Sequence, residues 1–372
     1  MIITVGSVAA GGACVGRVPD GRVVFVRHAL PGETVRLEIT SDGAKFLRAD
    51  AVEILEPSAD RVPPPCPSAG PGKCGGCDWQ HASPSAQLSL KQVLVAEQLR
   101  RVAGFSWDGQ VEAVEPLLGW RTRSQWARGI GFHRHRSSVL ELVDSCPISV
   151  EPTPPGELGT VVEVAAAQGQ RAVTVDGRGS GGLRVEVLGR RFEVAAGGFW
   201  QVHVDAPRVL ASAVLDGLDP QPGESVVDLY AGVGLFACLL GERVGPTGSV
   251  LAVEASTRAC ADAARNSDDQ PWVKVRTETV TARLLGRISA SLIVLDPPRA
   301  GAGVEVCAAL AALRPRALAY VSCDPATFAR DLRVFTDAGW QVASLRAFDL
   351  FPQTEHVETV TILTPPSSPS PS

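Results

Sequence analysis

The stretch Tyr320-Val321-Ser322-Cys323-Asp324-Pro325-Ala326-Thr327-Phe328-Ala329-Arg330-Asp331-Leu332 decides how the carboxyl-terminal half of this chain folds. An apolar run over residues 317–321 is typical of a buried strand, and Pro325 stands where helices favour proline, in the first turn. We therefore predict that Cys323 lies between the carboxyl end of a strand and the amino end of a helix. Open α/β sheets bind ligands at that edge, and the helix dipole favours the thiolate form of a cysteine placed there.

Cys323 has two interpretations. It is either a nucleophile or a buried cysteine that behaves as a small hydrophobic side chain, which is the common case for an unpaired cysteine. The chain on either side of it favours the first interpretation, because a ligand-binding turn and further polar residues are expected at the same edge.

A glycine-containing turn upstream predicts the ligand. Residues 225–229 read as a strand that runs into Tyr230-Ala231-Gly232-Val233-Gly234, followed by a helix. Gly232 and Gly234 let the backbone approach a ligand closely, and Glu254, which ends the next strand, is placed to accept hydrogen bonds from ribose hydroxyls. Together these residues predict an adenosine-bearing ligand.

Two carboxylates are expected at the same edge. Asp228 closes the strand before the glycine turn, while Asp296 follows an apolar strand and precedes Pro297-Pro298, a pair that does not continue a sheet. Two further runs, 340–350 and 356–363, are predicted to form a closing hairpin. The region from residue 219 onward thus reads as a doubly wound α/β fold.

Residues 1–57 predict a small β-barrel. Strand-like apolar runs alternate with turn signals such as Gly11-Gly12, Pro19-Asp20-Gly21 and Asp42-Gly43. Short strands in close succession suit a barrel of the OB type, an architecture that often binds oligonucleotides. The strands are expected over residues 2–8, 13–18, 22–26, 34–39 and 44–54.

The nine cysteines occur in a chain whose first residues show no signal peptide. This indicates metal binding or catalysis in a reducing cytoplasm rather than a disulfide framework. Cys66, Cys74 and Cys77 lie on a glycine-rich loop, where tight turns can bring sulfurs together, and Cys146 is a fourth candidate ligand. Four thiolates suit either a tetrahedral zinc ion or an iron–sulfur cluster, and the spacing leaves both open.

The formal net charge of −5 does not indicate a nucleic-acid-binding protein, but one segment departs from this balance. Residues 121–136 include five arginines and no acidic residue. We expect this arginine segment either to contact a nucleic-acid phosphate backbone or to form a solvated face. The arginines are Arg121, Arg123, Arg128, Arg134 and Arg136.

No apolar window of the sequence approaches the length of a membrane span.

Taken together, these stretches resemble the bacterial RNA uracil-5-methyltransferases over nearly the whole chain. The amino-terminal region is similar to a TRAM domain through Gly11-Gly12-Ala13-Cys14-Val15-Gly16-Arg17 and His28-Ala29-Leu30-Pro31-Gly32-Glu33. The other matching motifs are the four cysteines, Gly198-Phe199-Trp200-Gln201-Val202, Asp228-Leu229-Tyr230-Ala231-Gly232-Val233-Gly234, Asp296-Pro297-Pro298-Arg299, Ser322-Cys323-Asp324-Pro325 and Phe351-Pro352-Gln353-Thr354-Glu355-His356-Val357-Glu358-Thr359.

The resemblance implies the chemistry and the role of each residue. Cys323 would be the nucleophile and Glu358 the base, with Glu355 as a rival that chemistry alone does not exclude. The resemblance also implies S-adenosylmethionine as methyl donor, a [4Fe–4S] cluster on Cys66, Cys74, Cys77 and Cys146, and RNA as substrate, most like 23S ribosomal RNA. It places the following residues at S-adenosylmethionine: Gln201, Asp228, Tyr230, Gly232, Gly234, Glu254 and Asp296.

Pattern and resemblance together predict a multi-domain fold. An OB-like β-barrel of the TRAM type (1–57) precedes a central α+β iron–sulfur domain (58–195). An α/β Rossmann-like methyltransferase sheet (196–364) follows, and a disordered tail (365–372) ends the chain. We expect a cytoplasmic monomer that requires neither a membrane nor a protein partner.

Two features depart from the family pattern, and three alternatives remain. The spacer between Cys66 and Cys74 is long, and His203 stands where an asparagine is expected. The first alternative is a uracil-5-methyltransferase that acts on transfer RNA. The second is an amino-group methyltransferase that uses Asp296-Pro297-Pro298 as a polar clamp and needs no nucleophilic cysteine. The third is a non-catalytic RNA-binding protein with a redox-sensing cluster, against which the glycine turn argues.

Overall fold

The computed structural model describes residues 1–366, so residues 367–372 of the predicted tail lie outside the described residues. An N-terminal barrel (residues 1–57) contains the predicted strands, and Val24 and Val26 alternate inward from β3 to form part of its core. The strand order is β1-β4-β5-β3-β2, with β3 and β5 parallel. The strands are β1 (Ile2–Thr4), β2 (Cys14–Arg17), β3 (Val23–Arg27), β4 (Thr34–Asp42) and β5 (Phe46–Glu56).

An eight-stranded sheet forms the centre of the carboxyl-terminal half, in the order β17-β16-β15-β18-β19-β21-β20-β6. All neighbouring strands are parallel except β21, which is antiparallel to both β19 and β20. This confirms the predicted α/β fold and its closing hairpin. The strands are β6 (Val111–Ala113), β15 (Ser225–Leu229), β16 (Ser249–Glu254), β17 (Val273–Thr277), β18 (Leu292–Leu295), β19 (Ala317–Ser322), β20 (Gln341–Asp349) and β21 (Glu358–Thr364).

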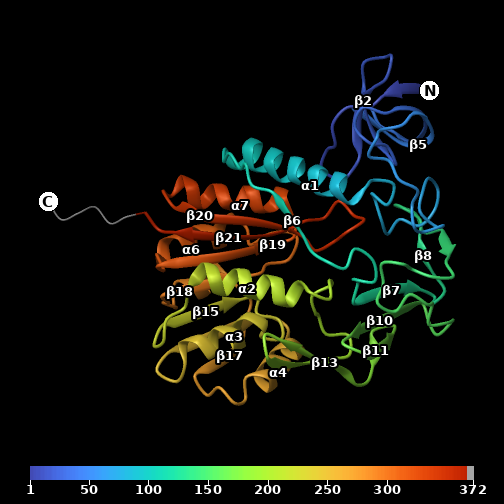
Figure 1. Cartoon of the computed structure of the whole chain (residues 1–372). Helices are drawn as coiled ribbons and strands as arrows, with labels where there is room; N and C mark the ends of the chain where they lie inside the picture. The colour runs from blue at the N-terminus through green and yellow to red at the C-terminus, as the bar shows by residue number, and fades with distance from the viewer. Residues whose placement is uncertain (367–372) are drawn as a thin grey trace.

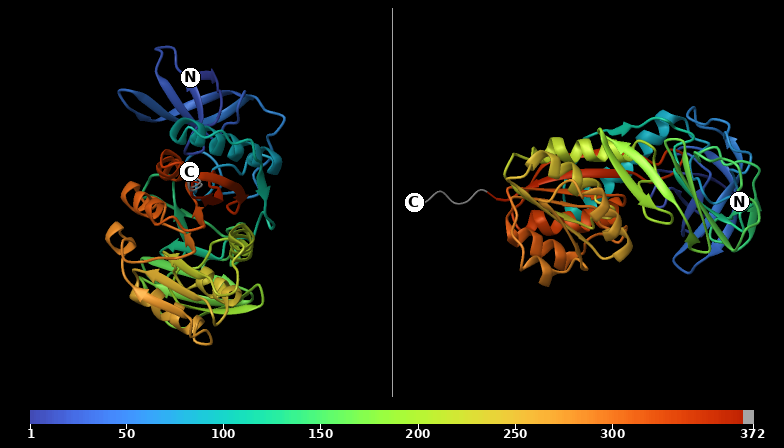
Figure 2. Two further views of the ribbon diagram at one scale, coloured as in Figure 1. Left: turned by 90° about the vertical axis from the view of Figure 1, so that its left-hand side faces the viewer. Right: turned by 90° about the horizontal axis from the view of Figure 1, so that it is seen from below.

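Helices cover both faces of this sheet (Figures 1 and 2). One hydrophobic core joins α2 and α3 to one face, and a second joins α1, α5, α6 and α7 to the other. Strands β18 and β19 are largely apolar and are buried along their whole length, as expected for a parallel sheet that is covered on both faces. The helices are α1 (Pro84–Gln98), η1 (Leu99–Ala103), α2 (Ala206–Leu218), α3 (Leu235–Val244), α4 (Thr257–Asn266), α5 (Ala282–Leu285), α6 (Val304–Leu313) and α7 (Pro325–Asp337).

A second antiparallel sheet lies beside the eight-stranded one, in the order β12-β11-β10-β7-β8-β9, and β13 and β14 form a separate hairpin. Figure 1 shows this sheet below the N-terminal barrel, on the same side of the large sheet. Its strands are β7 (Arg123–Ala127), β8 (Gly131–His133), β9 (Leu140–Leu142), β10 (Val161–Ala167), β11 (Gln170–Val175) and β12 (Arg178–Gly179), and the hairpin comprises β13 (Gly182–Val187) and β14 (Arg190–Ala195).

Two elements within the predicted central domain, 58–195, pack with the large sheet. Helix α1 and strand β6 lie in this range but belong to the large sheet, because α1 packs on α7 and β6 pairs with β20. The pairing of β6 with β20 joins distant parts of the chain and leaves no local signal in the sequence. Within residues 1–366, no helix is long and apolar enough to cross a membrane.

Candidate functional site

Cys323 lies where the sequence predicted, between β19 and α7. Asp324 caps the helix, because its carboxylate accepts a hydrogen bond of 2.8 Å from the backbone N–H of Thr327. Pro325 occupies the first turn. Since β19 is buried along its whole length, the cysteine emerges at the carboxyl edge of the sheet from a rigid support.

Glu358 is the first residue of β21, the strand beside Cys323. The antiparallel register pairs Val321 with Val360 and Ser322 with Thr359, so it places Glu358 opposite Cys323 at the end of the ladder. Only 4% of Glu358 is exposed. The structure therefore brings the predicted nucleophile and the predicted base together, although 35 positions separate them in the sequence, as their numbers show.

Burial and nearby carboxyl groups act against the thiolate form of Cys323, which the helix dipole was expected to favour. Burial raises the pKa of Cys323 to about 12, helped by the carboxyl of Glu358, while Arg299 acts in the other direction. Burial also raises the pKa of Glu358 well above its usual value, and that of Asp296 to about 6. Desolvation thus acts against the thiolate form that the helix dipole favours.

The rival carboxylate, Glu355, has a different environment. Its Oε2 accepts a hydrogen bond of 3.1 Å from the backbone N–H of Gly11 in the N-terminal barrel. Its own backbone N–H lies 3.4 Å from Oδ2 of Asp78, which follows the cysteine loop. Glu355 therefore links domains, whereas Glu358 faces the end of β19.

The glycine turn follows β15 at the same edge. Tyr230, Gly232 and Gly234 all adopt positive φ angles, of 61°, 54° and 88°. The carboxylate of Glu254 closes the turn, since Oε2 accepts from the Gly232 N–H at 3.0 Å and Oε1 accepts from Ser256 at 2.7 Å. A β-carbon built on Gly232 would meet no atom within 4 Å, so this backbone faces open space. Such a turn can accommodate a ligand close to the main chain.

Asp228 and Asp296 differ in their relation to this edge. Asp228 is fully buried behind the glycine turn, where it accepts from the Ala237 N–H at 2.9 Å and so anchors the start of α3. Asp296 is reached by Gln201, whose Nε2 lies 3.2 Å from Oδ2. Asp228 therefore shapes the turn from within, while the Gln201–Asp296 pair lies at the end of β18 beside Cys323.

His203, the departure from the family pattern, has a structural environment. It is fully buried and stacks on Trp120, with 5.8 Å between ring centroids. Its Nδ1 accepts from the Asp205 N–H at 3.1 Å, so Nε2 carries the proton and donates to the Pro116 carbonyl at 3.3 Å. His203 thus makes two hydrogen bonds to the backbone, neither of them to a predicted ligand residue.

Cys66, Cys74, Cys77 and Cys146 line one cavity of about 460 Å³ between the cysteine loop and the six-stranded sheet. The loop fits closely against this sheet, since a β-carbon on Gly75 would lie 2.8 Å from the backbone of His135. Within residues 1–366, no three His, Cys, Asp or Glu side chains converge on one point as a single metal ion requires.

The arginine segment is largely neutralised by acids from later in the chain. Arg123 pairs with Glu163 at 2.7 Å, Arg134 with Glu141 at 2.9 Å, and Arg128 with Glu157. Arg121 lines the cysteine cavity. These pairings favour the solvated-face interpretation for much of the segment.

Sequence reasoning did not assign a role to Arg299. It directly follows Asp296-Pro297-Pro298, is exposed, and lowers the pKa of both Cys323 and Glu358 through its positive charge. Its position next to the motif was the available signal. Arg299 supplies positive charge at an edge where carboxyl groups predominate.

Comparisons with known proteins agree at both ends of the chain. The family model described as tRNA (Uracil-5-)-methyltransferase matches residues 183–365, and the TRAM domain model matches residues 2–52. A Streptomyces coelicolor protein described as an uncharacterized RNA methyltransferase is 45% identical, with 98% of this chain and 92% of that protein covered. The 23S rRNA (uracil(1939)-C(5))-methyltransferase RlmD of Thiobacillus denitrificans is 30% identical, with 92% of this chain and 95% of that protein covered.

A solved structure shares the whole architecture. It is the Pyrococcus abyssi tRNA (uracil-54, C5)-methyltransferase in complex with S-adenosyl-L-homocysteine, which is 20% identical. It has a TM-score of 0.72 and covers 98% of this chain and 100% of that chain. This likeness establishes the arrangement of the fold.

Proposed function

Because the chain belongs to the RNA uracil-5-methyltransferase family, we propose that it methylates carbon 5 of a uridine in 23S ribosomal RNA through a covalent cysteine–uracil adduct. The observation that carries the proposal is the register of β19 and β21, which sets Glu358 opposite Cys323. A nucleophile and a base are needed in one pocket for this chemistry.

The uracil ring is the reason for covalent catalysis. Carbon 5 is a poor nucleophile, and addition of the Cys323 sulfur to carbon 6 turns the ring into an enolate with electron density on carbon 5. S-adenosylmethionine supplies the electrophilic methyl group that carbon 5 takes. Glu358 then removes the carbon 5 proton, and the sulfur leaves carbon 6.

The residues around the glycine turn suit S-adenosylmethionine. Gly232 leaves open space at the main chain, and Glu254 is fixed beside it by two backbone N–H groups. Tyr230 and the Gln201–Asp296 pair complete the carboxyl edge between the turn and Cys323. Asp228 acts from behind, as the anchor of α3.

The four cysteines hold a [4Fe–4S] cluster in this proposal. Support comes from the shared cavity, which is lined by thiols from separate parts of the chain. Burial raises the pKa of Cys77 to about 12, so a bound cation would favour the thiolate form of this side chain.

In this proposal the N-terminal barrel contacts the RNA, and the paired arginines do not. Phe25 and Phe46 meet edge to face at 5.6 Å between centroids, and the guanidinium of Arg48 lies 5.4 Å from the Phe46 centroid. Phe46 is 41% exposed. An aromatic ring beside a cation suits an unstacked nucleobase and its phosphate. We define these residues as the barrel surface.

Relatives favour 23S ribosomal RNA over transfer RNA. Proteins named as 23S rRNA enzymes match the chain at about 30% identity over almost its full length, whereas the matching transfer-RNA enzyme is similar in fold alone. The amino-group alternative is not favoured, because it gives no role to a cysteine opposite a buried carboxyl group.

The test is mass spectrometry of 5-methyluridine in ribosomal and transfer RNA from cells with and without the protein. We expect one or more 23S positions to lose the methyl group and to regain it with the wild-type chain but not with Cys323→Ala. Loss confined to transfer RNA would select the other substrate. Unchanged 5-methyluridine in both RNAs would contradict the proposal.

A further inference from the structure

The loop between β20 and β21 leads directly into Glu358, and its conformation decides where that carboxyl group lies. The loop comprises residues 350–357 and is buried over much of its length. Gln353 at its centre adopts a φ of 71°, which is unusual for a residue other than glycine. A loop in such a conformation is kept in place only by strong contacts with its surroundings.

Gln87 of α1 makes the first of these contacts. Its Oε1 accepts from the Gln353 N–H at 2.8 Å, and its Nε2 donates to Gln353 Oε1 at 3.1 Å. The same Nε2 lies 3.0 Å from the Ala82 carbonyl and 3.2 Å from that of Trp79. Gln87 is 2% exposed, so this carboxamide serves the loop and not the solvent.

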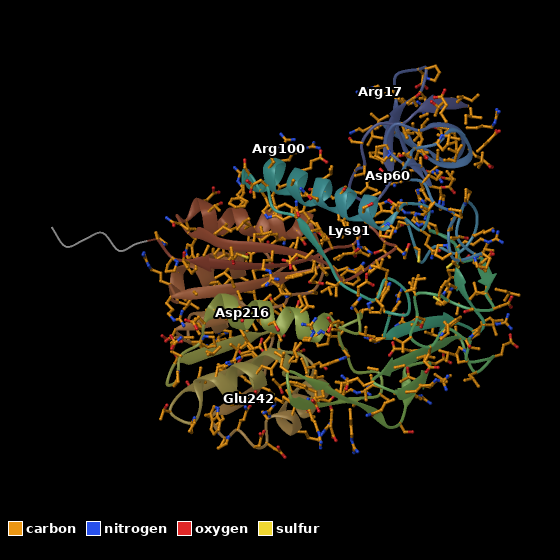
Figure 3. The ribbon with its side chains drawn as sticks, in the orientation of Figure 1. Arg17, Asp60, Lys91, Arg100, Asp216 and Glu242 are labelled. Atoms are coloured by element: carbon orange, nitrogen blue, oxygen red, sulfur yellow. The ribbon has the colours of Figure 1, made fainter. Side chains whose placement is uncertain are left out.

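Lys91, one turn further along α1, makes the second contact. Its Nζ lies 2.5 Å from Oδ1 of Asp349 and 3.0 Å from the carbonyl of Phe351. Lys91 and Asp349 are 0% and 2% exposed. Figure 3 labels Lys91 beneath α1, where the helix passes over the end of the large sheet. Burial of a charged pair is costly and adds little stability over an apolar pair of the same shape.

The chain next to the cysteine loop makes the third contact. The backbone N–H groups of Asp78 and Trp79 both point at the Gln353 carbonyl, at 3.0 Å each. The Trp79 indole in turn donates to the Gly12 carbonyl of the barrel at 2.9 Å. Gln353 is therefore held from α1 and from the segment that follows Cys77.

We infer that Gln87 and Lys91 are positioning residues for Glu358, which fix the loop so that the carboxylate reaches the carbon 5 proton. They lie in a region, 53–182, that neither family model covers. Their spacing of four positions puts both on the buried face of α1. This inference rests on the proposed function and adds residues that act through Glu358 without touching the substrate.

The inference assigns the two residues to one step. In that step the carbon 5 proton passes to the Glu358 carboxylate, and the electron pair of the C–H bond forms the double bond between carbons 5 and 6. The bond between carbon 6 and the Cys323 sulfur breaks, and its electrons leave on sulfur. Thiol addition and methyl transfer depend on β18, β19 and the glycine turn, whereas the side-chain hydrogen bonds of Gln87 and Lys91 go to the loop before Glu358 and to its flanks.

The experiment uses the full-length protein with Gln87→Met and, separately, Lys91→Met. Rapid-quench assays measure methyl transfer in a single turnover, and denaturing electrophoresis measures decay of the methylated RNA–protein adduct. We expect the rate of methyl transfer to stay within about threefold of wild type. Elimination should be slower by roughly 10- to 100-fold, because a small misplacement of a catalytic group lowers the rate by that order. Equal slowing of both steps, or no slowing of either, would overturn the inference.

Two further variants separate positioning from stability. Lys91→Met alone leaves the buried Asp349 carboxylate without its partner, and adding Asp349→Leu removes that charge, so thermal stability should recover. Elimination should remain slow in the double variant, because the contact of Lys91 with the Phe351 carbonyl is still absent. Recovery of elimination along with stability would overturn the inference. Arg316→Met is the matched control. It breaks the Glu224 ion pair at the amino edge of the sheet and should change neither step.

Glu358→Gln supplies the reference for both proposals. If it accumulates adduct and the α1 variants do not, only the positioning inference fails. If Glu358→Gln accumulates none, the proposed role of Glu358 fails, and the inference fails with it.

Discussion

Cys323 and Glu358 lie in a setting that disfavours the charged form of each. Burial is the main cause for both, and the two carboxyls Glu358 and Asp296 add to it. Arg299 compensates only in part. A sulfonium bound beside the glycine turn would bring the missing positive charge, so we expect the donor itself to activate the thiol.

Alkylation of Cys323 by iodoacetamide tests whether the bound methyl donor activates the thiol. With a pKa of about 12, the thiolate fraction should rise about tenfold per pH unit from pH 7 to 10. At fixed pH, S-adenosylmethionine should speed alkylation by about tenfold relative to S-adenosylhomocysteine, because its sulfur is positively charged and lowers the pKa of Cys323. Peptide mapping by mass spectrometry measures the rate at Cys323 alone.

Protection by both compounds to the same extent would contradict this explanation. S-adenosylhomocysteine is the matched control, since it lacks only the methyl group and its charge.

The position of Cys323 was predictable from sequence, but its ionisation was not. The apolar strand, Cys323 and Pro325 are local signals that give the strand–helix junction directly. The pKa depends on Glu358 and Asp296, which approach only when separate strands pair. The local sequence indicates the helix dipole at Cys323 but not the burial that raises the pKa of its thiol.

At the level of elements, the sequence predicted where strands and helices form. It did not predict which strands pair or which side chains form ion pairs. The barrel strands and the turn after β15 were confirmed because turn residues and periodicity mark them locally. The arginine segment looked unpaired because Glu141, Glu157 and Glu163 lie outside it. The pairing of β6 with β20 joins residues more than 200 positions apart, as their numbers show.

The barrel surface gives a prediction for RNA binding. Arg48→Ala should weaken binding and reduce the slope of log K against log salt by about 0.7, as expected for one lost phosphate contact on single-stranded RNA. Phe46→Ala should weaken binding by about 1–3 kcal/mol and leave the slope unchanged, because stacking is not ionic. Fluorescence anisotropy with an RNA fragment at several salt concentrations measures both.

Arg128→Ala is the control for a surface arginine that already has a partner, Glu157. It should leave the slope unchanged. A lower slope for Arg128→Ala together with an unchanged slope for Arg48→Ala would return RNA binding to the arginine segment.

At the level of the whole molecule, distant parts of the chain meet at the loop before Glu358. The barrel reaches it through Gly11, the segment after the cysteine loop through Asp78, and α1 through Gln87 and Lys91. The sequence predicted the order of the domains. It did not predict this convergence, because Gln87 and Lys91 are polar residues on an apolar helix face and look exposed in a linear reading.

The cysteine site predicts a colour. Protein purified without oxygen should be brown, with broad absorption near ~400 nm from a cysteine-ligated cluster. Cys77→Ser should lose iron and colour, while Cys307→Ala, a buried cysteine of α6 away from the cavity, should retain both. A folded, colourless protein that carries one zinc ion would contradict the cluster and leave the fold unaffected.

The central claim is covalent catalysis with Cys323 as nucleophile and Glu358 as base. The most direct measurement is denaturing electrophoresis of RNA incubated with labelled S-adenosylmethionine and the Glu358→Gln protein. Glutamine keeps the size of the side chain and lacks its basicity, so methyl transfer should proceed and elimination should stall. A labelled RNA–protein band should accumulate, and it should be absent with Cys323→Ala, Glu358→Gln. Normal turnover by Glu358→Gln with adduct from Glu355→Gln would mean that the other carboxylate is the base, and activity of Cys323→Ala without any adduct would contradict the covalent mechanism.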